Sequence, residues 1–177
     1  MSVSLPPAAP APAAAPEELL QQHLLATWRY LRMHGASTHE ADDLTQEAFV
    51  IALQKRATAL DPAATATFLR RTARFLFLHL RRDSRPAHEL ADAVDALWDA
   101  RCADDGGDGL LETLRECVAH LQGRAREAIE RCYGLGADTP AARDAAADAL
   151  GLQPNGLKTL LQRTRQALRA CIERRQP

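Results

Sequence analysis

Residues 145–161 read AAADALGLQPNGLKTLL, and this stretch indicates two helices joined by a tight turn. Gly151 supplies the backbone conformation that such a turn needs, and Ala146 and Ala147 are small enough to let the two helices approach closely. A pair of helices joined in this way is typical of a helix-turn-helix, whose second helix lies in the major groove of DNA.

The helix that begins at Pro154 is predicted to have two faces. The apolar face consists of Leu157, Leu160, Leu161, Thr164, Leu168 and Ile172. The opposite face carries polar side chains that can reach base edges and phosphates, namely Asn155, Lys158, Thr159, Gln162, Arg163 and Gln166. No acidic residue occurs between Pro154 and Leu168, which favours DNA contact over an ordinary solvated face.

The helical period continues through the chain from Glu17, and no strand pattern occurs. Helices are predicted over residues 17–35, 39–57 and 64–83, the second with its N-cap at Ser37 or Thr38. Four further helices are predicted to begin near Leu110, after Gly123, at Thr139-Pro140 and at Pro154. We therefore predict an all-α fold.

Composition divides the chain into four segments. Residues 1–16 are almost entirely Pro, Ala and Ser, and we expect this tail to be disordered. Residues 17–85 are predicted to form a three-helix domain and residues 110–175 a four-helix domain. The intervening residues 86–109 are acidic and end in a run of Asp and Gly, so we interpret them as a linker. The prediction is thus two small helical domains joined by an acidic linker.

The chain has 177 residues and a formal net charge of −1, so it is less basic overall than most DNA-binding domains. Its charges are, however, sorted into blocks along the sequence. Acidic blocks cover residues 39–50 and 86–109, and basic blocks cover residues 68–85 and 154–177. Each basic block could therefore meet phosphate groups.

The first basic block lies on the helix predicted over residues 64–83. Its arginines occupy one broad face of that helix, and they are Arg70, Arg71, Arg74, Arg81 and Arg82. A stripe of Phe68, Thr72, Phe75 and His79 runs beside them. A basic face flanked by aromatic rings suits single-stranded or melting DNA. The alternative, which stays open here, is a solvated arginine face with buried phenylalanines.

Two motif sets resemble those of bacterial sigma factors. Residues 39–49, HEADDLTQEAF, resemble the region 2 helix that docks on the RNA polymerase clamp, and residues 68–74, FLRRTAR, resemble the next part of region 2. Residues 121–169, which include the helix-turn-helix, resemble region 4. The whole arrangement resembles the extracytoplasmic-function (ECF) group, which keeps only regions 2 and 4.

The resemblance implies a transcription initiation factor that binds core RNA polymerase and directs it to promoter DNA. It implies no enzymatic activity, cofactor, metal or small-molecule substrate, and it leaves room for an anti-sigma factor as a partner. The contacts that it implies with polymerase are Asp42, Asp43, Gln46, Glu47 and Phe49. Those with the minus-ten element are Arg70, Arg71, Arg74, Phe75 and Arg81, and those with the minus-thirty-five element are Asn155, Lys158, Thr159, Gln162, Arg163 and Gln166.

The sequence departs from the family pattern at Phe75, where these proteins usually have Asn. An Asn could hydrogen-bond a base edge, whereas a phenylalanine cannot. We expect Phe75 to be buried, because exposed phenylalanines are less common than buried ones. The alternative is an exposed ring that stacks on an unpaired base. In either case, we predict weak discrimination at the promoter base that the Asn would read.

Several other classes of protein fit the sequence poorly. It has no apolar run long enough to cross a bilayer and no signal peptide, so we expect a cytoplasmic protein that joins the nucleoid when bound to polymerase. His34, His39 and Asp42 could be imagined as metal ligands, but we interpret the histidines as surface residues.

Four cysteines occur, at positions 102, 117, 132 and 171, without zinc-site spacing. We expect reduced thiols in a reducing compartment. The alternative is a metal site or a redox switch.

Two other functions stay open at this point. The first is a helix-turn-helix regulator that binds DNA without polymerase. The second is an anti-sigma-like or scaffold protein that binds polymerase or its partners but not DNA.

Overall fold

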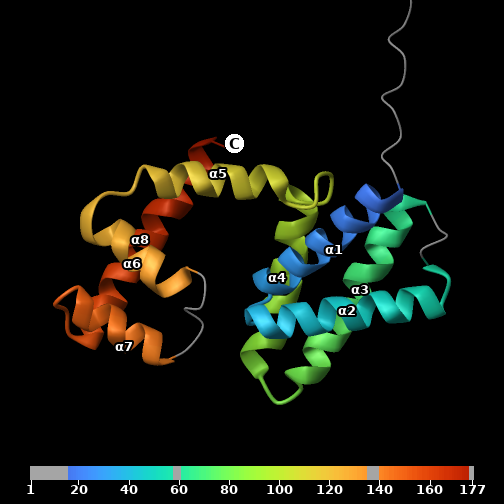
Figure 1. Cartoon of the computed structure of the whole chain (residues 1–177), viewed down its shortest axis with the longest axis horizontal. Helices are drawn as coiled ribbons and strands as arrows, with labels where there is room; N and C mark the ends of the chain where they lie inside the picture. The colour runs from blue at the N-terminus through green and yellow to red at the C-terminus, as the bar shows by residue number, and fades with distance from the viewer. Residues whose placement is uncertain (1–15, 58–60, 135–139, 176–177) are drawn as a thin grey trace, which may run out of the picture.

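A computed structural model describes residues 16–57, 61–134 and 140–175. These residues form eight α-helices and contain no strand, which confirms the predicted all-α fold (Figure 1). The helices are α1 (Pro16–Met33), α2 (Thr38–Gln54), α3 (Pro62–Leu80), α4 (Arg85–Arg101), α5 (Asp108–Ala119), α6 (Gly123–Tyr133), α7 (Pro140–Ala149) and α8 (Pro154–Arg175). The predicted disordered tail lies, up to residue 15, outside the described residues.

Helices α1, α2 and α3 pack together around one hydrophobic core, as Figure 1 shows on its right side. The start of α2 is fixed by a capping box, since Glu40 N–H donates to the Ser37 hydroxyl and Ser37 N–H donates to the Glu40 carboxylate. Asp61 caps α3 in a similar way, because its carboxylate accepts from Ala64 N–H at 3.0 Å. The predicted cap at Ser37 is therefore confirmed.

Helix α4 corrects the prediction of a linker over residues 86–109. Residues 85–101 form a helix of 17 residues, and it packs against α1 and α3. Trp98 is 2% exposed and meets the ring of Tyr30 edge to face at a centroid distance of 5.3 Å. Because Ala91, Trp98 and Cys102 share the buried side, α4 is part of the first domain rather than a tether.

Helices α5 to α8 form the second unit. Its core contains the small residues Ala146 and Ala147 of α7, which face Leu157 and Leu161 of α8 across a tight turn. Gly151 has a φ of +62°, in the left-handed region, and its N–H donates to the carbonyl of Asp148 at 3.0 Å. The predicted turn at Gly151 is thus present.

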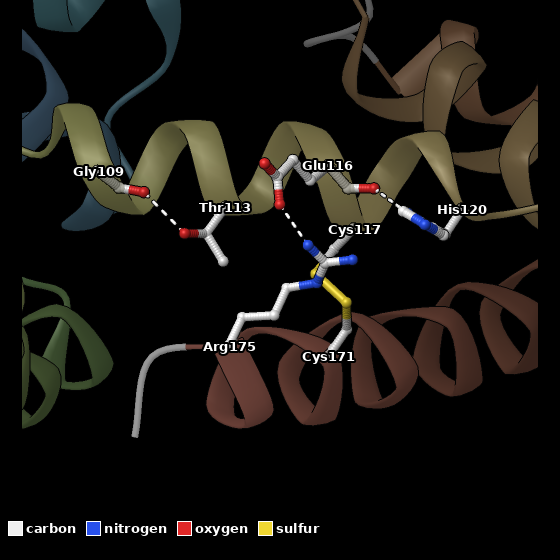
Figure 2. The surroundings of a disulfide bond; sticks show 7 residues. All are labelled: Gly109, Thr113, Glu116, Cys117, His120, Cys171 and Arg175. Carbon is white, nitrogen blue, oxygen red and sulfur yellow. Dashed lines mark hydrogen bonds and ion pairs between the residues drawn. A yellow bond between two sulfur atoms is a disulfide. The ribbon is translucent and has the colours of Figure 1, made fainter.

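A disulfide joins Cys117 of α5 to Cys171 of α8 (Figure 2). The expectation of four reduced thiols was therefore wrong for this pair. A separation of 54 residues matches no cysteine motif, so only the packing of α5 on α8 reveals the bond. Cys102 and Cys132 are free and buried, and burial raises the pKa of both thiols above its ordinary value.

We expect reduction of this disulfide to lower the free energy of unfolding of the second unit by about 2–4 kcal/mol, because the bond closes a long loop. The measurement is the thermal unfolding of helical circular dichroism with and without a thiol reductant. The control is Cys117→Ser with Cys171→Ser, whose melting temperature should be low and insensitive to reductant. An unchanged wild-type melting temperature on reduction would contradict the prediction.

Candidate polymerase and nucleic-acid interfaces

One side of α2 carries the acidic residues predicted to meet polymerase. Asp43, Gln46 and Glu47 are exposed there, and the last two lie about one helical turn after Asp43. Asp42 is also exposed, but its carboxylate accepts a hydrogen bond from the Trp28 indole at 2.7 Å. The helix thus presents acids on a rigid element whose opposite side is buried in the core.

Phe49, the fifth predicted polymerase contact, lies elsewhere. Its ring is 7% exposed and belongs to the core on the opposite side of α2, so it positions the helix and offers no docking surface. Two apolar residues that the prediction missed, Val50 and Leu53, are 51% and 61% exposed. They follow Asp43 and Glu47 along the same face, and a helical projection of the sequence could have found them. We call Asp43, Gln46, Glu47, Val50 and Leu53 the α2 surface.

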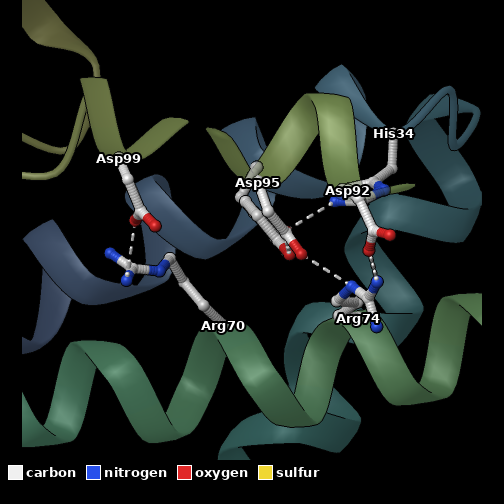
Figure 3. Close-up of polar contacts among 7 residues, drawn as sticks. His34, Arg70, Arg74, Asp92, Asp95 and Asp99 are labelled. Carbon is white, nitrogen blue, oxygen red and sulfur yellow. Dashed lines mark hydrogen bonds and ion pairs between the residues drawn. The ribbon is translucent and has the colours of Figure 1, made fainter. Parts of the chain in front are cut away.

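The arginines of α3, together with Arg81 and Arg82 just beyond its end, fall into two stripes rather than one face. The inner stripe, defined as Arg70, Arg74 and Arg81, is held by acids of other helices. Arg81 pairs with Glu40 of α2 at 2.6 Å. Arg70 pairs with Asp99 of α4 at 3.3 Å (Figure 3). Three of the predicted minus-ten residues are therefore already engaged within the protein.

Arg74 is the most heavily engaged member of the inner stripe. Its guanidinium lies between two carboxylates of α4, at 2.6 Å from Asp92 and 2.8 Å from Asp95 (Figure 3). These partners are 18 and 21 positions further along the chain, so the pairing depends on how α4 folds back and not on the local helical period of α3.

The outer stripe of α3, defined as Arg71, Phe75 and Arg82, is open to solvent. Phe75 is 69% exposed, so the expectation that it is buried was wrong. Its ring stacks on His79 with centroids 6.2 Å apart and planes 10° apart. No ion pair involves Arg71 among the residues that the structure describes.

A shallow hollow of about 520 Å³ lies beside the outer stripe. The residues that line it are Arg71, Arg74, Phe75, Leu78, His79, Arg82 and His88. It combines guanidinium groups with an exposed, stacked pair of rings. This chemistry suits the phosphate and the flat face of an unpaired nucleotide.

Asp95 ties α4 to the interior of the first domain. Its carboxylate accepts a short hydrogen bond from the Tyr30 hydroxyl. It also lies 3.6 Å from Nε2 of His34 (Figure 3). The His34 side chain is 1% exposed, and its ring meets Tyr30 at a centroid distance of 4.6 Å. Burial lowers the pKa of His34, although Asp95 opposes this effect, and burial raises the pKa of Tyr30.

Because the pKa of His34 is lower in the folded protein than in the unfolded chain, acid should destabilise the fold. Neutral His34 suits the core, so stability is retained above the unfolded pKa of about 6.5 and lost progressively as the pH falls below it. The charged neighbours Asp95 and Arg74 pull in opposite directions, and burial decides the sign.

We expect urea unfolding at pH 7 and pH 5.5 to show a larger loss of stability for wild type than for His34→Gln, which cannot titrate in this range. Equal losses in the two proteins would show that His34 does not govern the acid response.

The polar face of α8 is arranged as predicted. All six residues predicted to meet the minus-thirty-five element are exposed, namely Asn155, Lys158, Thr159, Gln162, Arg163 and Gln166. Leu157, Leu161, Thr164 and Leu168 are buried on the other side, while Leu160 is half-buried. The division into two faces is confirmed, and contact with DNA stays a prediction.

The histidines considered as metal ligands do not converge. The interpretation of both histidines as surface residues was wrong for His34, whose side chain is 1% exposed and faces Asp95. His39 is exposed and lies 3.3 Å from the carboxylate of Asp43. Within residues 16–57, 61–134 and 140–175, no three His, Cys, Asp or Glu side chains are grouped so as to hold a metal ion. Over the same ranges, no helix combines the length and apolar character needed to span a membrane.

Comparison with known proteins finds one match, and it lies in the first domain. Residues 19–86 match the family model described as Sigma-70 region 2, from the first helix to the start of α4. Neither a curated protein nor a solved structure matches the chain. The match includes both the α2 surface and the two arginine stripes of α3, and it supports a sigma-factor-like part in transcription initiation. Residues 19–86 are therefore similar to the Sigma-70 region 2 family.

Proposed function

We propose that this protein is a transcription initiation factor of the ECF type, which binds core RNA polymerase and directs it to promoters through two DNA-contacting domains. The observation that carries the proposal is the region 2 match, combined with an exposed acidic helix inside the matched segment. The protein would act in the cytoplasm and associate with the nucleoid once it is bound to polymerase. It would act without a cofactor or small-molecule substrate.

The α2 surface is the proposed contact with core polymerase. Asp43 and Glu47 give it negative charge, while Val50 and Leu53 add apolar area that would be buried on docking. A basic and partly apolar groove on polymerase would complement it. The fixed capping box and the buried Phe49 keep this helix in place, so docking needs little rearrangement.

The outer stripe of α3 is the proposed contact with the minus-ten element. Arg71 and Arg82 would meet the phosphates of the separated strand, and Phe75 with His79 would stack on a base. The inner stripe is already paired with acids, so its part in DNA binding is secondary. Of the residues assigned to the minus-ten element from the sequence, Arg71 and Phe75 are therefore proposed as the main contacts.

The second unit is proposed to act as a region 4-like domain. The tight turn at Gly151 and the exposed polar face of α8 support this proposal. Arg163 and Lys158 would contact base edges or phosphates of the minus-thirty-five element as duplex. An anti-sigma factor, if one exists, would be expected to cover either this face or the α2 surface.

The test is a binding experiment with a pool of duplex fragments from bacterial genomic DNA. The proposed function predicts specific retention of fragments only when the protein and core polymerase are both present. Specific retention by the protein alone would favour a helix-turn-helix regulator. Binding to polymerase without any retained fragment would favour a scaffold.

We expect Phe75→Ala to weaken binding of the single-stranded minus-ten sequence by about 1–3 kcal/mol, the energy of one stacked base. Stability should change little, because the ring is exposed. Phe75→Asn should sharpen the preference at one minus-ten base, measured by transcription from promoters permuted at each position. If the wild type is already selective and Phe75→Asn changes nothing, position 75 does not govern base choice.

A further inference from the structure

The acids of α4 occupy the same guanidinium groups that a nucleic acid would use. We propose that α4 is an intramolecular competitor, in which Asp92 and Asp99 withhold Arg74 and Arg70 from phosphates and lower the affinity of the free protein for DNA. The inference rests on the proposed function, since it assumes that α3 faces the minus-ten strand. The proposed competition by α4 would limit how tightly α3 binds that strand.

The geometry is that of a substitute for phosphate. Asp92 lies 2.6 Å from the Arg74 guanidinium, and Asp99 lies 3.3 Å from that of Arg70 (Figure 3). A carboxylate and a phosphate both offer oxygen atoms to the same forked set of N–H donors. A phosphate that uses the same N–H donors must therefore displace these carboxylates.

Asp92 and Asp99 are free to move, whereas the helix that carries them is not. Their side chains are 92% and 66% exposed, so each can rotate into solvent. Trp98, at 2% exposure, holds α4 against the core between them. The two carboxylates consequently stay near the arginines at high effective concentration, and DNA must compete with them each time it binds.

Asp95 differs from Asp92 and Asp99 because it also contacts buried residues. It faces Tyr30 and His34 as well as Arg74, and its side chain is only 34% exposed. Changing it would disturb the buried cluster and confuse the test. The exchangeable positions are therefore Asp92 and Asp99.

The test uses the full chain and a fluorescein-labelled single-stranded DNA of mixed sequence, with binding followed by anisotropy across a series of salt concentrations. Asp92→Asn with Asp99→Asn should tighten binding by about threefold to tenfold, as expected for losing two exposed ion pairs. The slope of log affinity against log salt should steepen by about 0.7, because Arg70 becomes free to neutralise one more phosphate while Asp95 still pairs with Arg74.

The matched control is Glu89→Gln with Glu112→Gln, which changes the net charge equally. Both of these acids are exposed, and each pairs with an arginine of its own helix. The control should leave the salt slope unchanged. Thermal unfolding of each variant checks that the fold is intact, and the single variant Asp92→Asn serves if the double variant is unstable.

Failure of the competitor and failure of the proposed function give different results. If Arg71→Ala with Arg82→Ala weakens binding but the Asp92 and Asp99 variants match wild type, the competitor is wrong and the DNA contact stands. An equal gain in the Glu89 and Glu112 control would also overturn it, since net charge would explain the effect. If no variant binds the oligonucleotide, including the one without the acids, both proposals fail.

Discussion

Changing Asp43 and Glu47 together to Lys is expected to abolish binding to core polymerase, with a fall in affinity of about a hundredfold or more. The α2 surface would change from acidic to basic, so its charges would oppose the groove that it is proposed to enter. Both residues are exposed and lie outside the hydrophobic core, so the fold should remain stable. The measurements are the affinity for core polymerase and the melting temperature of each variant.

The control for this reversal is Glu89→Lys with Glu112→Lys, which changes the net charge by the same amount on α4 and α5. It should bind core polymerase nearly as well as wild type. If the Asp43 and Glu47 variant still binds at normal strength, α2 does not carry the docking surface. Equal losses in both variants would point to overall charge instead.

Replacing Trp98 with Ala is expected to cost about 3–5 kcal/mol of stability, the usual loss for a large aromatic ring removed from a core. The ring is 2% exposed and packs edge to face on Tyr30, so its removal would weaken the packing of α4 on the first domain. The melting temperature of the first domain should fall by well over ten degrees, or the domain should fail to fold. Chemical denaturation of the variant gives the value.

Leu97→Ala is the matched control, because Leu97 is the neighbouring residue and is 47% exposed. It should cost less than about 1 kcal/mol. Similar stabilities for the two variants would mean that α4 is held weakly, and that residues 85–101 behave as the linker that the sequence suggested.

Local patterns predicted every described helix except α4. The turn at Gly151 depends on one left-handed residue, and the start of α2 depends on a hydroxyl three residues before a carboxylate, so both can be found in the sequence. The polar face of α8 follows from the helical period in the same way. Such features involve residues only a few positions apart.

Features that depend on distant residues could not be predicted in this way. The ion pair between Arg70 and Asp99 spans 29 positions, and the disulfide spans 54. The acidic composition of residues 86–109 indicated a linker, whereas the burial of one tryptophan makes much of that segment a packed helix. Charge blocks show where acids and bases lie along a chain, and only tertiary structure shows which of them meet.

Phe49 illustrates a different error. It lies four positions after Thr45 and three before Ala52, both of which are buried, so the helical period alone would have placed it on the core side of α2. Its assignment to the polymerase contact came from the motif resemblance. The resemblance pointed to the helix as a whole, and the periodicity was the better guide to the side that this residue faces.

The proposal that this protein directs core polymerase to promoters can be tested by transcription in vitro. The reaction contains bacterial core polymerase and a genomic DNA template, and the RNA 5′ ends are sequenced. If the protein is a promoter-directing factor, adding it should produce transcripts that begin at defined positions, each preceded by the same two spaced sequence elements. The Asp43 and Glu47 double variant should produce none of them. Start sites identical to those of core polymerase alone would contradict the proposed promoter-directing role.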